Sequence, residues 1–225
     1  MNQKSLKISI ASLGILILWV ATINLVSAQK TGTSKELDAR VGKFLNENRE
    51  NWRDWNVPYE DGKALYDLII KNNYTRALEI GTSTGHSAIW MAWALSKTGG
   101  RLITIEIDEG RYRRALKNFK KAGVENLIDA RLADAHRLVK ELKGPFDFVF
   151  SDADKEWYTQ YFKDVEPKLV IDGCFTAHNV THADGGVMEF LEYIRGLSNY
   201  ETTVIRSSPS GISISYKKSI APSPR

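Results

Sequence analysis

Four polar side chains stand directly after apolar, strand-like segments of the sequence and could do chemistry together. Asp152 and Lys155 follow the segment Phe146–Phe150, and His178 and Asn179 follow the next such segment. Because the carboxyl ends of strands in an open α/β sheet form the ligand crevice, we expect the four side chains to meet there. An amine beside a bound cation is suited to take a proton from a hydroxyl. Asp152 could also serve as the N-cap of the helix that follows.

A glycine-containing turn lies earlier in the chain. The segment Glu79–Ser87 places Gly81 and Gly85 in a G-x-x-x-G spacing. A dinucleotide-binding loop has the spacing G-x-G-x-x-G, and Ser83 stands where its second glycine would be, which disfavours a pyrophosphate ligand. Glu106 ends the next strand-like run, where an acid can accept hydrogen bonds from both ribose hydroxyls. Together these features predict a ligand with an adenosyl group; the alternative is a structural turn followed by a surface acid.

Alternating strand and helix patterns must position these residues. This alternation is typical of a parallel sheet with helices on both faces. The end of the chain differs, because residues 202–205 and 212–216 flank a Ser-Ser-Pro-Ser-Gly turn and predict an antiparallel β-hairpin. The predicted strands are Arg76–Ile80, Leu102–Ile107, Ile128–Leu132, Phe146–Phe150 and Leu169–Ala177, and the predicted helices are Glu60–Lys71, His86–Ser96, Arg111–Lys121, His136–Leu142 and Trp157–Val165.

Length and composition fit one α/β domain with a short appendage. The chain has 225 residues, of which 43% are hydrophobic and 26% charged, and its formal net charge is +4. This mild charge predicts no nucleic-acid partner. The single cysteine, Cys174, cannot form an internal disulfide, and its apolar surroundings predict a buried small side chain instead of a nucleophile.

The N-terminus has the layout of an export signal. Two lysines precede an apolar run over residues 8–26, and Val26-Ser27-Ala28 forms a small-residue cleavage pattern. The run is also long enough to anchor the chain in a bilayer. We therefore expect an exported (periplasmic or secreted) or membrane-anchored protein, with the side of the membrane left open. The predicted parts are residues 1–28 as signal peptide or anchor, 29–56 as linker and N-terminal helix, 57–218 as the α/β domain and 219–225 as a tail.

Three motifs at the predicted strand ends carry a family resemblance. They are Glu79-Ile80-Gly81-Thr82-x-x-Gly85-x-Ser87-Ala88, Ile103-Thr104-Ile105-Glu106 and Phe146-Asp147-Phe148-Val149-Phe150-x-Asp152-Ala153-Asp154-Lys155-x-x-Tyr158. Together they resemble the cation-dependent O-methyltransferases, which include catechol and caffeoyl-CoA O-methyltransferases and their bacterial relatives. The resemblance implies a Rossmann-like class I methyltransferase fold with a mostly parallel seven-stranded sheet. It also implies S-adenosylmethionine (SAM) as methyl donor and a small hydroxylated, catechol-like acceptor.

The resemblance further implies roles for individual residues. Lys155 would be the catalytic base, and Asp152 and Asn179 would be metal ligands. The residues that would bind or surround SAM are Val57, Glu79, Gly81, Thr82, Gly85, Ser87, Glu106, Asp134, Ala135 and Asp152.

His178 departs from the family pattern, which usually has Asp-Asn at this point. The chain has Ala177-His178-Asn179, so an imidazole replaces a carboxylate. Imidazole suits Mn, Fe, Co, Ni or Zn better than Mg or Ca, so we expect Asp152, His178 and Asn179 to hold such a divalent ion. His182 could add a second nitrogen. The alternatives are that the ion is Mg, that His178 binds no metal and only hydrogen-bonds within the crevice, or that metal binding is lost.

Three functions remain open from the sequence. They are a metal-assisted O-methyltransferase, a metal-independent methyltransferase with His178 or Lys155 as base, and a non-catalytic SAM-binding module. The presence of Lys155 together with Asp152 favours an enzyme. We expect a small-molecule acceptor as the partner and contact with a membrane only through the N-terminal segment; a homodimer is left open. Because SAM is made in the cytoplasm, an exported domain would need a supply of it.

Overall fold

The computed structural model of the chain describes residues 34–181 and 184–219, in two units that divide between residues 39 and 40. Residues 34–39 of the first unit are helical, and so are residues 40–47 of the second. The predicted signal peptide or anchor, His182 and most of the predicted tail lie outside the described residues. Within the described ranges, no helix is long and apolar enough to cross a membrane.

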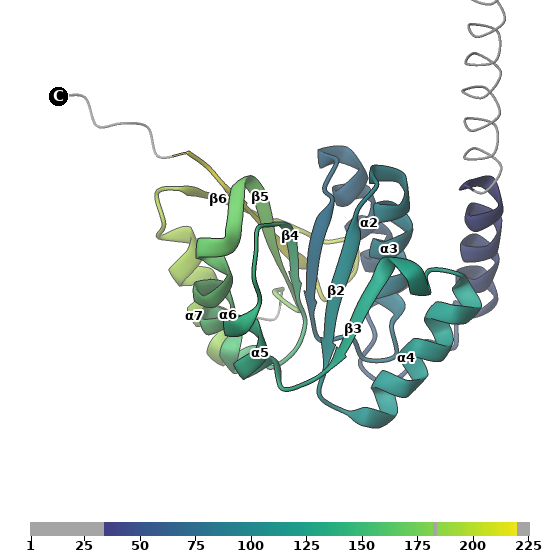
Figure 1. Ribbon diagram of the computed structural model, residues 1–225. Coiled ribbons are helices and arrows are strands. Elements are labelled where there is room, and N and C mark those ends of the chain that lie inside the picture. The colour runs from purple at the N-terminus through teal and green to yellow at the C-terminus, as the bar shows by residue number, and fades with distance from the viewer. Residues whose placement is uncertain (1–33, 182–183, 220–225) are drawn as a thin grey trace, which may run out of the picture. The chain divides into compact units, whose positions relative to one another are not determined.

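The second unit is built on one seven-stranded sheet in the order β3-β2-β1-β4-β5-β7-β6 (Figure 1). β1 to β5 pair in parallel, and β7 pairs antiparallel with both β5 and β6. This confirms the predicted mostly parallel sheet and its antiparallel end. The strands are β1 Arg76–Ile80, β2 Arg101–Glu106, β3 Ile128–Leu132, β4 Phe146–Ser151, β5 Leu169–His178, β6 Tyr200–Ile205 and β7 Ile212–Lys217.

Helices cover both faces of the sheet, with α2, α3 and α4 on one side and α5, α6 and α7 on the other (Figure 1). The central strands are buried on both faces, which explains their nearly continuous apolar sequences. The helices are α2 Tyr59–Asn72, α3 His86–Thr98, α4 Glu109–Ala122, α5 Ala135–Glu141, α6 Tyr158–Val165 and α7 Gly185–Arg195.

The helix α7 was not predicted from the sequence. It begins with two glycines, of which Gly185 has a φ of +46°, and glycine pairs are usual in loops. The helix forms because Val187, Phe190, Leu191 and Ile194 recur at helical spacing and are all buried in the core. Tertiary packing therefore outweighs the local preference of the glycines.

The strand order reverses between β1 and β4, and this reversal positions the site. β1 leads outward to β2 and β3 on one side, while β4 and β5 lie on the other. In sheets of this kind, ligands bind where the order reverses, outside the carboxyl ends of the strands. The loops after β1, β2, β4 and β5 all begin at this edge.

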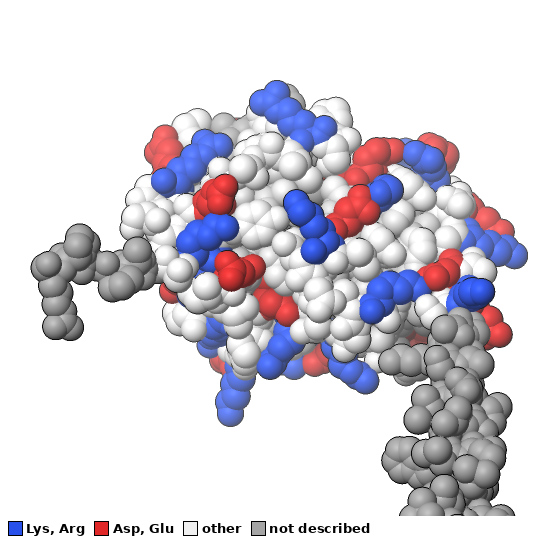
Figure 2. Space-filling view, turned by 90° about the horizontal axis from the view of Figure 1, so that it is seen from above, with Lys and Arg blue, Asp and Glu red and all other residues white. Residues whose placement is uncertain are grey.

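Charged side chains are interspersed over the surface seen from above. Figure 2 shows Lys and Arg side chains alternating with Asp and Glu on this face. On the described surface as a whole, some charged side chains pair as neighbours on a helix, such as Lys63 with Asp67 at 2.6 Å and Arg113 with Glu109 at 2.6 Å. The mild net charge is thus spread and not gathered on this face.

His86 begins α3 as a buried structural residue. Its Nδ1 lies 2.9 Å from the carbonyl oxygen of Val57, and its Nε2 accepts a hydrogen bond of 3.0 Å from the indole of Trp90. The ring stacks on Trp52 with centroids 4.4 Å apart. Burial lowers the pKa of His86 to about 4, so the imidazole is neutral.

We expect His86→Gln to make the stability of the protein less sensitive to acid. The pKa of His86 falls from 6.5 in the unfolded chain to about 4, so its contribution is complete above pH 6.5 and is lost as the pH falls toward 4. This shift corresponds to about 3 kcal/mol of stability lost between pH 7.5 and pH 4. Urea unfolding of both proteins across this pH range measures how the free energy of unfolding depends on pH. An equal dependence on pH in both proteins would contradict a neutral His86.

Candidate active site

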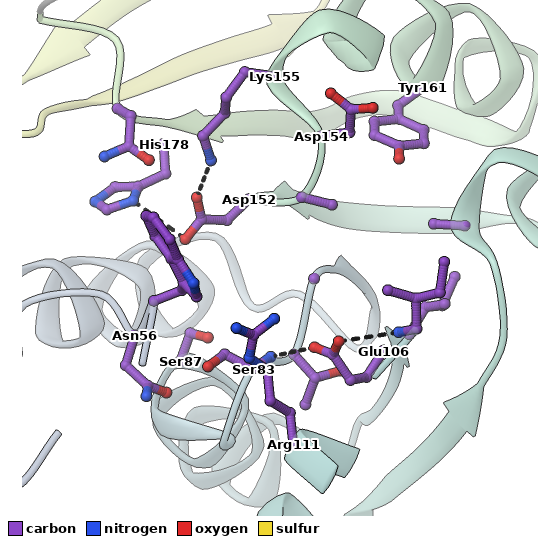
Figure 3. A pocket seen from close by; sticks show the side chains of 18 of the residues that line it. Asn56, Ser83, Ser87, Glu106, Arg111, Asp152, Asp154, Lys155, Tyr161 and His178 are labelled. Carbon is purple, nitrogen blue, oxygen red and sulfur yellow. Dashed lines mark hydrogen bonds and ion pairs between the residues drawn. The ribbon is translucent and has the colours of Figure 1, made fainter. Parts of the chain in front are cut away.

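A cavity of about 840 Å³ opens at the carboxyl ends of β1, β2, β4 and β5 (Figure 3). This volume is in the range of small-molecule sites. Val57, Glu79 and Gly85 are not among its lining residues. The predicted site residues that do line it are Gly81, Thr82, Ser87, Glu106, Asp134, Ala135, Asp152, Lys155, His178 and Asn179.

Gly81 allows the loops after β1 and β4 to touch. It has a φ of +100°, and a Cβ atom at this position would lie 2.7 Å from the carbonyl oxygen of Asp152. The backbone N–H groups of Gly81 and Thr82 both donate to the carbonyl of Ile105, at 3.1 Å. A side chain at residue 81 would therefore push the two halves of the cavity floor apart.

Glu106 lies on the glycine-loop side of the cavity. One carboxylate oxygen accepts a hydrogen bond of 2.7 Å from the N–H of Ser83, and the other accepts from Ile107 at 3.0 Å and Asp108 at 2.9 Å. Ser83 adopts a left-handed φ of +48°, so it takes the conformation expected of the glycine that it replaces. Backbone donors thus fix the direction of an acid that is only 6% exposed.

Glu79 lies beneath the loop and reaches the cavity through Ser87. Its side chain is fully buried and accepts hydrogen bonds from the hydroxyls of Ser87 and Thr104. Burial raises the pKa of Glu79 to about 8, although the two hydroxyl donors oppose this rise. Since Ser87 lines the cavity and Glu79 does not, Ser87 is the member of the pair that a ligand can contact.

Lys155 and Asp152 form an ion pair at the opposite end of the cavity. The Lys155 Nζ donates to Asp152 Oδ1 at 2.5 Å, as Figure 3 shows. The predicted N-cap function of Asp152 was wrong: Asp154 accepts the capping hydrogen bond from the N–H of Glu156 at 3.1 Å. The Asp152 carboxylate therefore remains available to side chains at the cavity.

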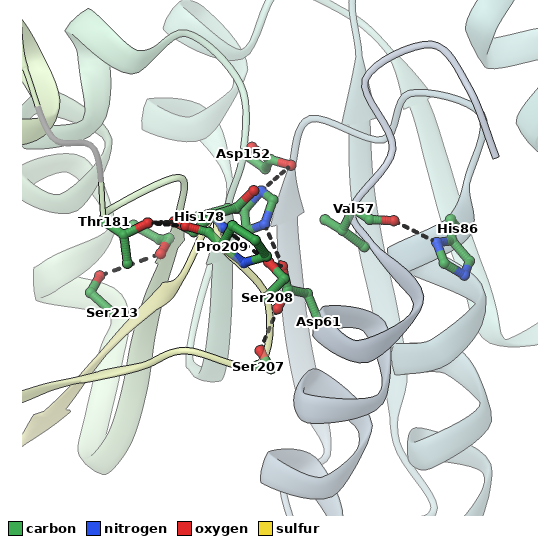
Figure 4. A network of polar contacts seen from close by, with 12 residues as sticks. Val57, Asp61, His86, Asp152, His178, Thr181, Ser207, Ser208, Pro209 and Ser213 are labelled. Atoms are coloured by element: carbon green, nitrogen blue, oxygen red, sulfur yellow. Dashed lines mark hydrogen bonds and ion pairs between the residues drawn. The ribbon is translucent and has the colours of Figure 1, made fainter.

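His178 lies between two carboxylates (Figure 4). Its Nε2 lies 2.8 Å from Asp61 Oδ2, and its Nδ1 lies 3.2 Å from Asp152 Oδ2. Burial acts to lower the pKa of His178, but the contacts with Asp152 and Asp61 outweigh it and raise the pKa to about 9. Burial likewise acts to raise the pKa of Asp61, but hydrogen bonds from His178, Ser207 and Ser208 outweigh it and lower that pKa.

Two of the residues implied as metal ligands, Asp152 and His178, lie close enough to share a divalent ion. Among the described residues, the buried Nδ1 of His178 has no aligned hydrogen-bond partner, although Asp152 Oδ2 is 3.2 Å away. Metal–ligand bonds of about 2.0–2.2 Å place neighbouring ligand atoms roughly 3 Å apart. No group of three His, Cys, Asp or Glu that could hold a metal occurs in the described ranges, so the amide of Asn179 would complete the set.

Three residues of the polar network beside His178 were not found from the sequence: Asp61, Ser207 and Ser208. Asp61 precedes Leu65 by four residues and Ile69 by eight, and all three are fully buried. A charge on the apolar face of a helix was therefore a signal that could have been used. The two serines lie in the predicted hairpin turn, where serine is ordinary and carries no signal.

Comparison with known proteins places the chain in a family. A family model described as O-methyltransferase matches residues 27–196. A catechol O-methyltransferase of Niastella koreensis is 48% identical over 111 residues, which cover 48% of this chain and 50% of that enzyme. A flavonoid 3',5'-methyltransferase of Vitis vinifera is 33% identical over 147 residues, or 63% of this chain and 62% of that enzyme. The chain thus matches about half the length of the first relative and under two thirds of the second.

Solved structures agree with this placement. The O-methyltransferase of Bacillus cereus, solved in complex with SAH, has a TM-score of 0.70 and 26% identity over 80% of this chain and 91% of that one. The O-methyltransferase TomG of Streptomyces achromogenes, solved with SAM, has a TM-score of 0.69 and 29% identity over 80% of this chain and 90% of that one. With the fold, the strand-end loops and the family match in agreement, the chain belongs to the O-methyltransferase family.

Proposed function

We propose that this protein is a SAM-dependent O-methyltransferase that methylates a hydroxyl of a small, catechol-like aromatic acceptor. The proposal rests on one observation: the two ends of a single cavity carry different functional side chains. One end has Glu106 and Ser87 beside the glycine loop, and the other has the Lys155–Asp152 pair. The named activities of the relatives from Niastella koreensis and Vitis vinifera support a hydroxylated aromatic acceptor.

For methyl transfer from SAM, the protein mainly has to align the acceptor hydroxyl and supply a base. The methyl carbon of SAM is already activated by the sulfonium, so the enzyme must hold the acceptor oxygen in line and remove its proton. As the new O–C bond forms and the S–C bond breaks, the hydroxyl proton passes to the amine of Lys155. Asp152 Oδ1, which lies 2.5 Å from the amine, then accepts a hydrogen bond from the resulting ammonium.

We further propose that Asp152, His178 and Asn179 hold a divalent ion. When bound, such an ion would lower the pKa of a coordinated hydroxyl. The imidazole should favour Mn²⁺, Fe²⁺, Co²⁺, Ni²⁺ or Zn²⁺ over Mg²⁺. One observation favours a metal-independent methyltransferase instead: a protonated His178 can link Asp61 to Asp152 and itself supply a positive charge.

Titration of metal-stripped full-length protein tests both proposals. We expect calorimetry to detect SAM binding, and methyl transfer to return at lower concentrations of Mn²⁺ than of Mg²⁺. Full activity in the presence of chelator would select the metal-independent enzyme. Absence of SAM binding under every condition would overturn the proposed function as a whole.

We propose that residues 1–28 take the protein to or across a membrane. The two lysines before the apolar run and the Val26-Ser27-Ala28 pattern support this proposal. Mass spectrometry of the protein from its native host should find a mature chain that begins at Gln29, or an intact anchor in the membrane fraction. Full-length protein in the soluble fraction would contradict both.

A further inference from the structure

A buried carboxylate of helix α2 lies outside the residues that the proposed reaction uses. Asp61 has no exposed surface, and three donors converge on its two oxygens. Ser207 donates to Oδ1, Ser208 donates to Oδ2 at 2.5 Å, and His178 Nε2 lies 2.8 Å from Oδ2 (Figure 4). A buried charge is costly unless it is fully hydrogen-bonded, so this arrangement is a built feature of the fold.

We propose that Asp61 is a positioning residue that holds the imidazole of His178 with Nδ1 directed toward Asp152 and the cation site. This inference rests on the proposed metal-assisted function. A carboxylate oxygen can only accept, so the contact with Asp61 places a proton on Nε2. A cation that binds at Nδ1, which lies 3.2 Å from Asp152 Oδ2, would displace any proton from that atom, while Asp61 keeps the proton on Nε2. Histidine ligands of metals are commonly oriented by a carboxylate on the other ring nitrogen.

The C-terminal hairpin holds Asp61 in place for this function. Ser207 and Ser208 lie between β6 and β7 and are 146 and 147 residues from Asp61 along the chain. The same turn is fastened to the segment after β5, because Ser210 accepts hydrogen bonds from the N–H and the hydroxyl of Thr181, at 3.1 and 2.8 Å. Helix α2, the end of β5 and the hairpin therefore meet at the Asp61 carboxylate.

The test is a double-mutant cycle of Asp61→Asn and His178→Asp, measured as Mn²⁺ affinity of the metal-stripped full-length chain by calorimetry. In the wild-type background, Asp61→Asn should weaken Mn²⁺ binding about 10–100-fold. In the His178→Asp background it should not weaken binding, because a carboxylate ligand has no tautomer to set and Asp61 would oppose it with like charge. Asp67→Asn, on the exposed side of the same helix, is the matched control and should change neither affinity.

Other readouts separate positioning from a merely structural role. Nitrogen NMR of metal-free His178 in its neutral form should show the proton on Nε2 in the wild type and a mixture of tautomers in Asp61→Asn. If that variant does not fold, Ser208→Ala removes one donor to the same oxygen and should show a smaller effect with the same dependence on background. An equal loss of Mn²⁺ affinity in both backgrounds, or no loss in the wild type, would overturn the inference.

Failure of the proposed function itself looks different. A wild-type protein that binds SAM and transfers methyl groups but binds no Mn²⁺ overturns the positioning inference and leaves the methyltransferase in place. A wild-type protein that neither binds SAM nor transfers methyl groups overturns the proposed function.

Discussion

Replacing Lys155 with methionine is expected to slow methyl transfer by about 10²–10⁴-fold, the usual effect of losing a positioned general base. The amine pairs with Asp152 at the acceptor end of the cavity, and Glu106 lies at the other end. SAM affinity should therefore change little. Single-turnover kinetics with saturating SAM, together with SAM calorimetry, separate the rate from the binding.

A matched control makes the Lys155 result specific. Lys163 lies on α6 and its amine stacks over Tyr193, 4.6 Å from the ring centroid. Lys163→Met removes the same charge from a neighbouring position and should leave turnover unchanged. Turnover of Lys155→Met near the wild-type rate would rule out Lys155 as the base.

Replacing Glu106 with alanine is expected to weaken SAM binding by about 1–3 kcal/mol, because the ribose hydroxyls would lose their buried acceptor. The structure adds a second cause, since Ser83, Ile107 and Asp108 would lose the acceptor of their N–H groups and the loop would lose its shape. Glu106→Gln keeps one acceptor oxygen and should lose less affinity than Glu106→Ala. Calorimetric titration with SAM measures both variants.

The control for Glu106 lies three residues further along the chain. Glu109 is an exposed acid that pairs with Arg113, so Glu109→Ala removes the same charge without touching the cavity. Its SAM affinity should equal that of the wild type. An unchanged SAM affinity in Glu106→Ala would contradict the assignment of Glu106 as the acid that binds the ribose hydroxyls.

The sheet could be predicted because the period and composition of its strands are local signals. The runs at β1, β3 and β4 are apolar, β-prone and bounded by turns, and their predicted ends agree with the structure to within one residue. Helix α7 could not be found in this way. Its apolar face follows a glycine pair, and only the core against which that face packs makes the helix form.

Site residues that directly follow strands could be predicted from the sequence. Site residues that tertiary packing brings together from distant parts of the chain could not. Their positions at or after strand ends were enough to predict that Glu106, Asp152, Lys155 and His178 lie at one edge of the sheet. The contact of His178 with Asp61 joins two residues that are 117 positions apart, and no spacing in the sequence carries that information. For the same reason, the sequence predicted His178 near Asp152 but not Asp61, the second carboxylate that raises the pKa of His178.

The most direct test of the account is methyl transfer from SAM carrying an isotopically labelled methyl group. Purified protein would be incubated with Mn²⁺ and a panel of catechols, flavonoids and hydroxycinnamates, and the products would be identified by mass spectrometry. We predict a labelled methyl ether on one hydroxyl of at least one catechol-like acceptor, and loss of that product in Lys155→Met. Binding of SAM without transfer to any hydroxylated aromatic would contradict the account and point to a non-catalytic SAM-binding module.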